Sequence, residues 1–170
     1  LGETVAVFKR AGYDATGIDA DPSMAAHHQK IGINAIVGQV EAIDLKGPYD
    51  VVHIAHAIYF VTKPMAFLAR VRGLMADNGL LCITNADFTF WRDGSLPNEH
   101  HTFCPTPSSM RAALALAGFC VVAEAWIAGS VYAVCKKCEP FRIPVSAHMT
   151  WLHWQTKRLR YALFGKPVNV

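Results

Sequence analysis

The chain has 170 residues, of which 52% are hydrophobic and 17% are charged. This length suits one domain, and the hydrophobic and aromatic content is too high for a disordered chain. The formal net charge of +3 is unevenly distributed: residues 1–135 carry nine Lys and Arg against twelve Asp and Glu, whereas residues 136–170 carry seven against one. A net −3 body with a net +6 tail disfavours a nucleic-acid-binding protein with a basic main domain.

Hydrophobic periodicity and turn residues divide the chain into alternating helices and strands. The short link Ile127-Ala128-Gly129 predicts that the last two strands form a hairpin. The stretch Asp87–Pro107 is long, polar and aromatic, which is typical of functional loops. In chain order, the patterns predict a helix at 5–11, a strand at 14–19, a helix at 22–30, strands at 34–37 and 49–55, a helix at 64–75, a strand at 80–84, a helix at 109–117, and strands at 120–126 and 130–136.

This alternation predicts a doubly wound α/β fold with a mostly parallel, Rossmann-like sheet and a C-terminal antiparallel hairpin. Such folds bind ligands beyond the carboxyl ends of their strands. Asp19 ends a predicted strand at that edge, where a carboxylate can accept hydrogen bonds from both hydroxyls of a ribose. The alternative is a helix-capping or solvated acid, because Asp21-Pro22-Ser23 can start a helix.

The five cysteines do not match the disulfide framework of a small secreted protein. Their number is odd and three lie in hydrophobic runs, which favours reduced thiols in a cytoplasmic protein. Cys135 and Cys138 form one CxxC motif, but no second Cys or His pair stands at zinc-binding spacing. We therefore expect no metal site.

Five parts of the sequence occur in the order and spacing of one family. They resemble the class I S-adenosylmethionine-dependent methyltransferases, in their small-molecule branch, over about residues 1–137. The resemblance implies transfer of a methyl group from S-adenosylmethionine to an oxygen, nitrogen or carbon of a small-molecule acceptor. The parts that carry it are Ala11–Met24 (AGYDATGIDADPSM), Gly38–Ala42, Tyr49–Val61, Leu74–Leu81, and the late segments Glu99–Phe103 and Leu116–Phe119.

The resemblance places the ribose and adenine of the cofactor against two short segments. Asp19 would accept hydrogen bonds from the ribose hydroxyls, and Ala20 would lie along the adenine edge. Gln39, Val40 and Glu41 would form the loop beside the adenine. Many family members have Asp where Gln39 stands, but a Gln side chain can also accept a hydrogen bond from the exocyclic amine.

The resemblance places the methionine part of the cofactor and the acceptor just past the segment 49–55. Ala55 and His56 would border both of them. The family often has a Glu-His pair where this chain has Tyr59-Phe60. Any role of that pair is lost here, and we expect a hydrophobic pocket wall instead.

Three histidines are candidates for a general base. His56 follows the segment 49–55, and His100 and His101 lie in the long loop that would cover the active site. A hydroxyl acceptor must lose its proton as it attacks the methyl carbon, and an imidazole can take that proton near neutral pH. The alternatives are ordinary loop hydrogen bonds for these histidines and a transfer that relies on alignment without a base.

The remaining histidines have simpler interpretations. His27 and His28 lie in the predicted helix 22–30 and are expected to face solvent. His53 lies within a hydrophobic segment and is expected to be a hydrogen-bonded core residue.

The beginning of the sequence departs from the family. The glycine-rich loop that lets the backbone approach the cofactor is almost absent, and Gly2 resembles its last glycine. In the family, the first strand lies between the second and the fourth, so its absence would leave two central edges without partners. We therefore expect an N-terminally truncated piece of a longer protein, and we expect this piece to bind the cofactor poorly by itself.

The sequence also predicts a boundary near its end. Residues 1–138 would form the methyltransferase-like domain, and residues 139–170 a basic, aromatic tail that is helical. Basic and aromatic residues alternate within 141–170, as they do in helices that lie on anionic membrane surfaces. Packing of this tail against the domain is the alternative that we favour.

Two other functions remain open from the sequence. A nicotinamide-dependent oxidoreductase of Rossmann fold shares the acid that follows the second strand, although the terminal hairpin and the Gly38–Glu41 loop argue against it. A non-catalytic binding domain that kept the methyltransferase fold is the second. The fold by itself identifies no acceptor.

Overall fold

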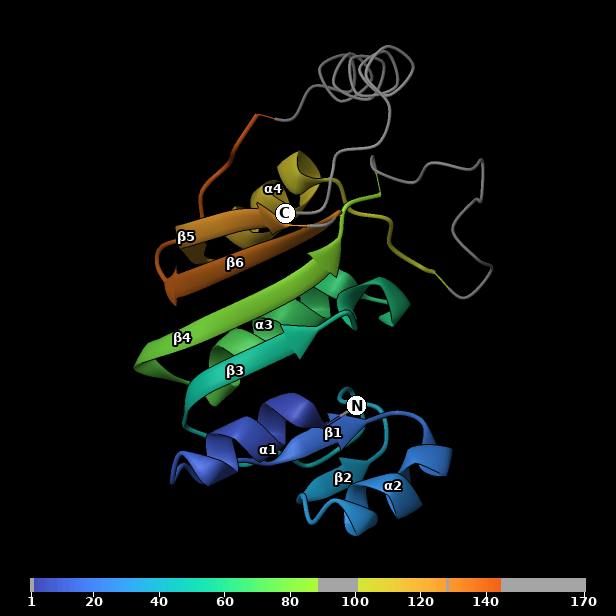
Figure 1. The fold of residues 1–170 in the computed structure, drawn as a ribbon. Coiled ribbons are helices and arrows are strands. Elements are labelled where there is room, and N and C mark those ends of the chain that lie inside the picture. Colours follow the sequence, from blue (N-terminus) through green and yellow to red (C-terminus); the bar gives the residue numbers. More distant parts are fainter. Residues whose placement is uncertain (1, 89–100, 128, 145–170) are drawn as a thin grey trace. The chain divides into compact units, whose positions relative to one another are not determined.

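The computed structural model describes residues 2–88, 101–127 and 129–144, and the chain divides into two compact units (Figure 1). Unit 1 comprises residues 1–45 and unit 2 comprises residues 46–170. Among the described residues, no helix combines the length and the hydrophobicity needed to cross a bilayer.

Unit 1 is built on a two-stranded parallel sheet. Its strands are short and align Gly17 with Ala35 and Asp19 with Val37. The chain reverses after the first helix at Gly12, whose φ of 88° favours glycine. In chain order, the elements are α1 (Glu3–Arg10), β1 (Gly17–Asp19), the 3₁₀ helix η1 (Pro22–Met24), α2 (Ala25–Lys30) and β2 (Ala35–Val37).

Unit 2 is built on a four-stranded sheet with the order β3-β4-β6-β5. β3 and β4 are parallel, whereas β6 is antiparallel to both β4 and β5. The predicted terminal hairpin and the expected α/β architecture are therefore confirmed. The elements are β3 (Tyr49–Ala55), the 3₁₀ helix η2 (Ile58–Phe60), α3 (Pro64–Leu74), β4 (Met75–Ala86), α4 (Pro107–Leu116), β5 (Phe119–Ile127) and β6 (Ser130–Lys137).

The core of unit 2 lies between one face of this sheet and the helices α3 and α4, which Figure 1 shows behind the strands. Alternate residues of a strand point to the same face. Leu81 pairs with Cys135 and Ile83 with Ala133, and all four are buried. The helices contribute the buried side chains of Phe67, Leu68, Val71, Met110 and Leu114.

Two strand edges are open among the described residues. β1 pairs with β2 alone, and β3 pairs with β4 alone. These are the two strands that the resemblance places next to the first strand of the family.

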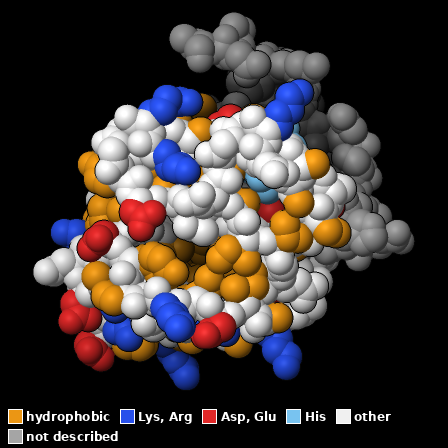
Figure 2. All heavy atoms as spheres, turned by 90° about the horizontal axis from the view of Figure 1, so that it is seen from below, with side chains coloured by type: hydrophobic (Ala, Val, Ile, Leu, Met, Phe, Trp, Pro, Cys, Tyr) orange, Lys and Arg blue, Asp and Glu red, His pale blue; other side chains and the backbone are white. Residues whose placement is uncertain are grey.

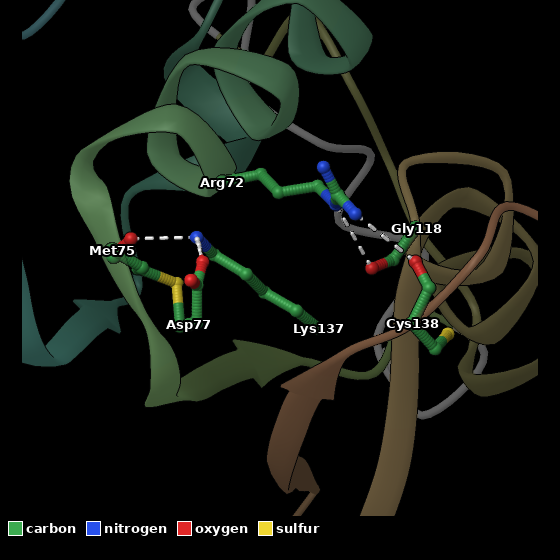
Figure 3. A network of polar contacts seen from close by, with 6 residues as sticks. All are labelled: Arg72, Met75, Asp77, Gly118, Lys137 and Cys138. Atoms are coloured by element: carbon green, nitrogen blue, oxygen red, sulfur yellow. Dashed lines mark hydrogen bonds and ion pairs between the residues drawn. The ribbon is translucent and has the colours of Figure 1, made fainter.

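The base of the terminal hairpin is tied to α3 by Arg72 (Figure 3). The Arg72 guanidinium donates to the carbonyl of Gly118 at 3.3 Å and to that of Cys138 at 3.2 Å. Beside it, Lys137 Nζ donates to the Met75 carbonyl at 2.6 Å. These contacts join residues that are 46 to 66 positions apart in the chain.

The predicted elements differ from the observed ones mainly at their ends. The strand predicted at 14–19 is reduced to Gly17–Asp19. The strand predicted at 80–84 extends over Met75–Ala86, because a register shift between Tyr49 and Val51 accommodates the Asn78-Gly79 turn within it. The division into a domain at 1–138 and a tail at 139–170 stays a prediction, because residues 145–170 lie outside the described residues.

Candidate active site

Asp19 ends β1 with a carboxylate that is only partly engaged. Oδ1 accepts a hydrogen bond from the Asp21 N–H at 3.0 Å, and the side chain is 28% exposed. The helix cap that the sequence left open is provided by Asp21, whose Oδ1 accepts from the Ser23 N–H at 2.9 Å. Hydrogen bonding with Ser23, first to its side chain and then to its backbone N–H, lowers the pKa of Asp21. Asp19 therefore keeps acceptor positions for a ligand, because a carboxylate can accept about four hydrogen bonds.

His28 corrects a prediction. Its residue is 5% exposed rather than solvent-facing, whereas His27 is exposed as expected. Its Nε2 lies 3.6 Å from Asp19 Oδ2, and its buried Nδ1 has no hydrogen-bond partner. Burial follows from the tight packing of α2 onto the turn before β2, where the Ile33 N–H donates to the His28 carbonyl.

The loop after β2 is fastened to the end of β1. The Gly38 N–H donates to the Asp19 carbonyl at 2.8 Å, and the φ of Gly38 is 149°. Gln39 then turns the chain, since its carbonyl accepts from the N–H groups of Ala42 and Ile43. Val40 and Glu41 lie within this turn. The predicted ribose and adenine segments thus share one end of the same small sheet.

Gly2 occupies a position whose backbone conformation favours glycine. Its φ is 84°, and a Cβ there would collide with the end of the Ile33 side chain, at Cδ1, and would lie in ordinary contact with His28 Cδ2 at 3.6 Å. Gly2 and Asp19 therefore both approach His28. Unit 1 brings together all the residues that the resemblance assigns to cofactor binding, apart from Ala55, which belongs to unit 2.

A hollow of about 370 Å³ also lies in unit 1. One of its lining residues is His28, which also lies beside Asp19. Figure 2 shows hydrophobic side chains gathered among charged ones at the surface. The exposed large hydrophobic residues of unit 1 are Val7, Tyr13, Ile18, Ile31, Ile36 and Val37.

In unit 2, the carboxyl ends of β3 and β4 carry the other candidate residues. Ala55 ends β3, and His56 follows it with a φ of 50°, an uncommon conformation for a residue other than glycine. The His56 N–H donates to the Thr84 carbonyl at 2.9 Å, which holds this conformation. Strained backbone of this kind concentrates at functional sites.

His101 returns to the same edge and packs against Tyr59. The ring centroids of His101 and Tyr59 are 4.9 Å apart, with an angle of 89° between the ring planes. The ring centroid of His56 lies 6.4 Å from that of Tyr59. Thr102 fixes this arrangement, because its Oγ1 donates to the Val61 carbonyl at 2.6 Å and its N–H to the Tyr59 carbonyl at 2.8 Å. The structure thus gathers His56 and His101 around one residue.

Comparison with known proteins decides the family. The model of a methyltransferase domain family matches residues 1–124. The chain belongs to this methyltransferase family. S-adenosylmethionine is the cofactor of the family. No curated protein matches the sequence.

Solved structures of methyltransferases share the fold. One is the 1,6-didemethyltoxoflavin-N1-methyltransferase of Burkholderia thailandensis, with bound 1,6-didemethyltoxoflavin and S-adenosylhomocysteine (TM-score 0.65, 19% identity, 81% of this chain and 67% of that one). Another is a TehB-like S-adenosylmethionine-dependent methyltransferase of Corynebacterium glutamicum (0.60, 13%, 80% and 74%). A third is an S-adenosylmethionine-dependent methyltransferase of Aquifex aeolicus (0.55, 21%, 70% and 67%).

Two further groups in this methyltransferase were not singled out from the sequence. Asp87 follows β4, is fully buried and accepts a hydrogen bond from Trp126 Nε1 at 3.1 Å. Thr102 anchors His101, as described above. The sequence contains no pattern that would identify Asp87 or Thr102, since both lie in the irregular stretch Asp87–Pro107, where local periodicity predicts no contacts. His100 and Glu99 lie outside the described residues.

His53 is less buried than predicted. The residue is exposed on β3, although its Nε2 lies 3.3 Å from Thr84 Oγ1, a hydrogen-bonding distance. Partial desolvation of the ring, followed by the nearby His56, lowers the pKa of His53. Its exposure follows from its place on β3, an edge strand of the sheet among the described residues.

The cysteines correct a second prediction. Cys120 and Cys138 form a disulfide with a Cα–Cα distance of 5.9 Å, so the methyltransferase does not have five reduced thiols in this structure. Cys135 of the CxxC motif points into the core instead, and burial raises its pKa to about 12. The motif therefore does not act as a paired dithiol. Within the described residues, no three His, Cys, Asp or Glu residues gather into a metal-binding group.

Proposed function

We propose that this protein transfers the methyl group of S-adenosylmethionine to an oxygen, nitrogen or carbon atom of a small-molecule acceptor. The observation that carries the proposal is the partly exposed carboxylate of Asp19. Asp21, not Asp19, caps η1, so the Asp19 carboxylate is not used for capping. The family match supports the chemistry, and the Asp19 site supports a ligand with vicinal hydroxyls.

In this proposal, unit 1 binds the nucleoside part of the cofactor. Asp19 accepts hydrogen bonds from the ribose hydroxyls, and Ala20 lies along the adenine. The turn of Gln39, Val40 and Glu41 lies beside the adenine edge. Gly2 lets the backbone approach the cofactor closely, because glycine has no side chain and its φ of 84° favours glycine.

Residues of unit 2 act on the acceptor. When bound, the cofactor supplies an electrophilic methyl group on a sulfonium. The acceptor atom forms a bond to the methyl carbon as the carbon–sulfur bond breaks, and S-adenosylhomocysteine leaves. Ala55 and His56 border this point, and His56 or His101 takes the proton of a hydroxyl acceptor. His100 is the third candidate from the sequence. Alignment of the reacting atoms supplies a large part of the rate.

Calorimetry on the protein in its full natural length tests the proposal. S-adenosylhomocysteine should bind and NAD should not. Asp19→Asn should weaken S-adenosylhomocysteine binding at least about tenfold, because a charge-assisted pair of hydrogen bonds is lost. Asp21→Asn is the matched control, two residues away, and should change the dissociation constant less than about twofold, since Asp21 only caps η1.

Other outcomes separate the remaining alternatives. Binding of NAD in place of S-adenosylhomocysteine would indicate an oxidoreductase. Equal losses in the Asp19 and Asp21 variants would remove the ribose role of Asp19. Tight binding of S-adenosylmethionine with no methyl transfer to any small molecule would favour the non-catalytic binding domain.

The segment 141–170 bears on where the enzyme works. We retain a cytoplasmic enzyme as the proposal, with peripheral membrane contact through this segment as its alternative. Co-sedimentation with vesicles of anionic lipid, with and without residues 141–170, distinguishes the two. Sedimentation that depends on these residues and falls with added salt indicates membrane contact.

A further inference from the structure

Four aromatic rings form a cluster where β3 and β4 end. Tyr59 is its centre, with ring centroids 4.6 Å from Phe60, 4.9 Å from His101 and 5.7 Å from Phe88. His101 also contacts Phe60 at 5.2 Å and Phe88 at 5.4 Å. We refer to Tyr59, Phe60, Phe88 and His101 as the aromatic cluster.

Three separate parts of the chain contribute to the aromatic cluster. Tyr59 and Phe60 belong to η2, just past β3, and Phe88 stands two residues past β4. His101 is held there by the Thr102 hydrogen bonds to the carbonyls of Tyr59 and Val61. The carboxyl ends of neighbouring parallel strands form the edge at which doubly wound folds bind ligands.

The aromatic cluster is not part of the core. The core residues Phe67 and Phe119 are 5% and 1% exposed, whereas Phe60 is 50% exposed. Tyr59, Phe88 and His101 are half-buried. A ring that packs its neighbours on one side and exposes the rest of its surface is available to stack on a further planar group.

The aromatic cluster carries few polar groups. Its side chains include no acid, Lys or Arg, and its polar atoms are the Tyr59 hydroxyl and the two His101 ring nitrogens, of which Nδ1 is buried and only Nε2 is offered to a ligand. The Tyr59 hydroxyl is protonated at neutral pH and can donate a hydrogen bond, and burial raises its pKa further. Such a surface suits an uncharged ring with polar atoms on its edge.

We propose that the aromatic cluster is the wall of the acceptor site and that the acceptor is a neutral, planar heteroaromatic molecule. This inference rests on the proposed function, since it names the substrate class of the same site. Phe60 supplies the exposed ring face on which the acceptor stacks. His101 lies at the edge of the stack, where its imidazole meets the polar atoms of the acceptor.

Lumazine, a neutral bicyclic heteroaromatic, is the probe for the test. Its binding to the full-length protein is measured by calorimetry with and without S-adenosylhomocysteine. Phe60→Leu keeps a hydrophobic side chain but removes the ring, and should weaken lumazine binding about threefold to tenfold. The same variant should leave the dissociation constant of S-adenosylhomocysteine unchanged.

Phe141→Leu is the matched control. Phe141 is 43% exposed, lies outside the aromatic cluster, and makes its backbone hydrogen bond to Ala115 through its N–H, which Leu keeps. It should bind lumazine like the natural protein. Thermal unfolding of both variants shows whether each keeps its fold.

Each remaining outcome has one meaning. Unchanged lumazine binding in Phe60→Leu, or an equal loss in Phe141→Leu, overturns the inference. Binding of tetramethylammonium in place of lumazine also overturns it, because an aromatic cluster that holds a cation serves a different acceptor class. If lumazine binds through Phe60 while S-adenosylhomocysteine does not bind, the proposed function fails and the aromatic site stands.

Discussion

The two units of this methyltransferase differ sharply in how much structure supports their candidate residues. Unit 1 has two three-residue strands, and its buried residues, among those described, are Ile33 and His28. Unit 2 has strands of seven to twelve residues and contains the remainder of the described core. The residues proposed to bind the cofactor, apart from Ala55, thus lie on the lightly packed unit, and those proposed to face the acceptor lie on the well-packed one.

This difference has a thermodynamic consequence. Segments with few buried contacts open with a low free energy, and a ligand that binds only the ordered form stabilises them. We therefore expect unit 1 to gain more hydrogen-exchange protection from S-adenosylhomocysteine than unit 2 does. The following changes test whether the two units are energetically separate.

The largest effect is expected from a cavity in unit 2. Leu68 in α3 is fully buried, so Leu68→Ala should lower the free energy of unfolding by about 2–5 kcal/mol in urea denaturation. Leu116→Ala is the matched control, because Leu116 is 48% exposed, and should cost less than about 0.5 kcal/mol. If hydrogen exchange in residues 2–45 accelerates as much as in unit 2, the contrast between the units is wrong.

The disulfide gives the next effect. It closes a loop of 18 residues around the terminal hairpin, so Cys138→Ser should destabilise unit 2 by about 3 kcal/mol. A reductant should lower the urea midpoint of the natural protein to that of the variant and leave the variant unchanged. Cys104→Ser removes an exposed free thiol and serves as the control. A midpoint that does not respond to reductant would contradict the pairing.

Alanine substitutions at two glycines, one in each unit, distinguish the cost of backbone strain from the cost of a steric clash. The φ of Gly12 is 88° and that of Gly118 is 80°. A Cβ at Gly12 would meet no atom within 4 Å, whereas a Cβ at Gly118 would lie 2.7 Å from Arg72 Nε. Gly12→Ala should cost about 1 kcal/mol. Gly118→Ala should cost about 2–3 kcal/mol, because it also disturbs the Arg72 contacts of Figure 3. Equal costs would show that Arg72 moves aside freely.

The smallest effect is a pH dependence from His53. Because the pKa of His53 is lowered in the folded protein, the unfolded chain takes up its proton first as the pH falls below the usual value of about 6.5. Stability should therefore be constant above that pH and decrease below it, until the folded state is protonated as well. The difference between the urea midpoints at pH 7.5 and pH 5.5 should be smaller in His53→Asn than in the natural protein. An unchanged difference would assign the effect to other groups.

Part of the candidate site could be proposed from the sequence because its signal is carried by neighbouring residues. Asp19 was identified from a short strand followed by an acid, and Tyr59-Phe60 from a departure at a family position. His28 could not be placed, because two adjacent histidines on a six-residue helix give no periodicity that distinguishes its faces. The pairing of Cys120 with Cys138 depends on the hairpin register and on Arg72, which lies far away in the chain.

The sequence by itself determined the alternation of helices and strands, the terminal hairpin and the family, since periods of two and 3.6 residues and short motifs are properties of neighbouring residues. The tertiary structure alone decided that Asp21 rather than Asp19 caps η1, that His28 is buried beside Asp19, and that η2, the end of β4 and His101 share one aromatic cluster. These outcomes depend on contacts between side chains distant in sequence or on competition among adjacent acids for the same N–H groups. Such contacts form only when packing brings the partners within hydrogen-bonding or van der Waals distance.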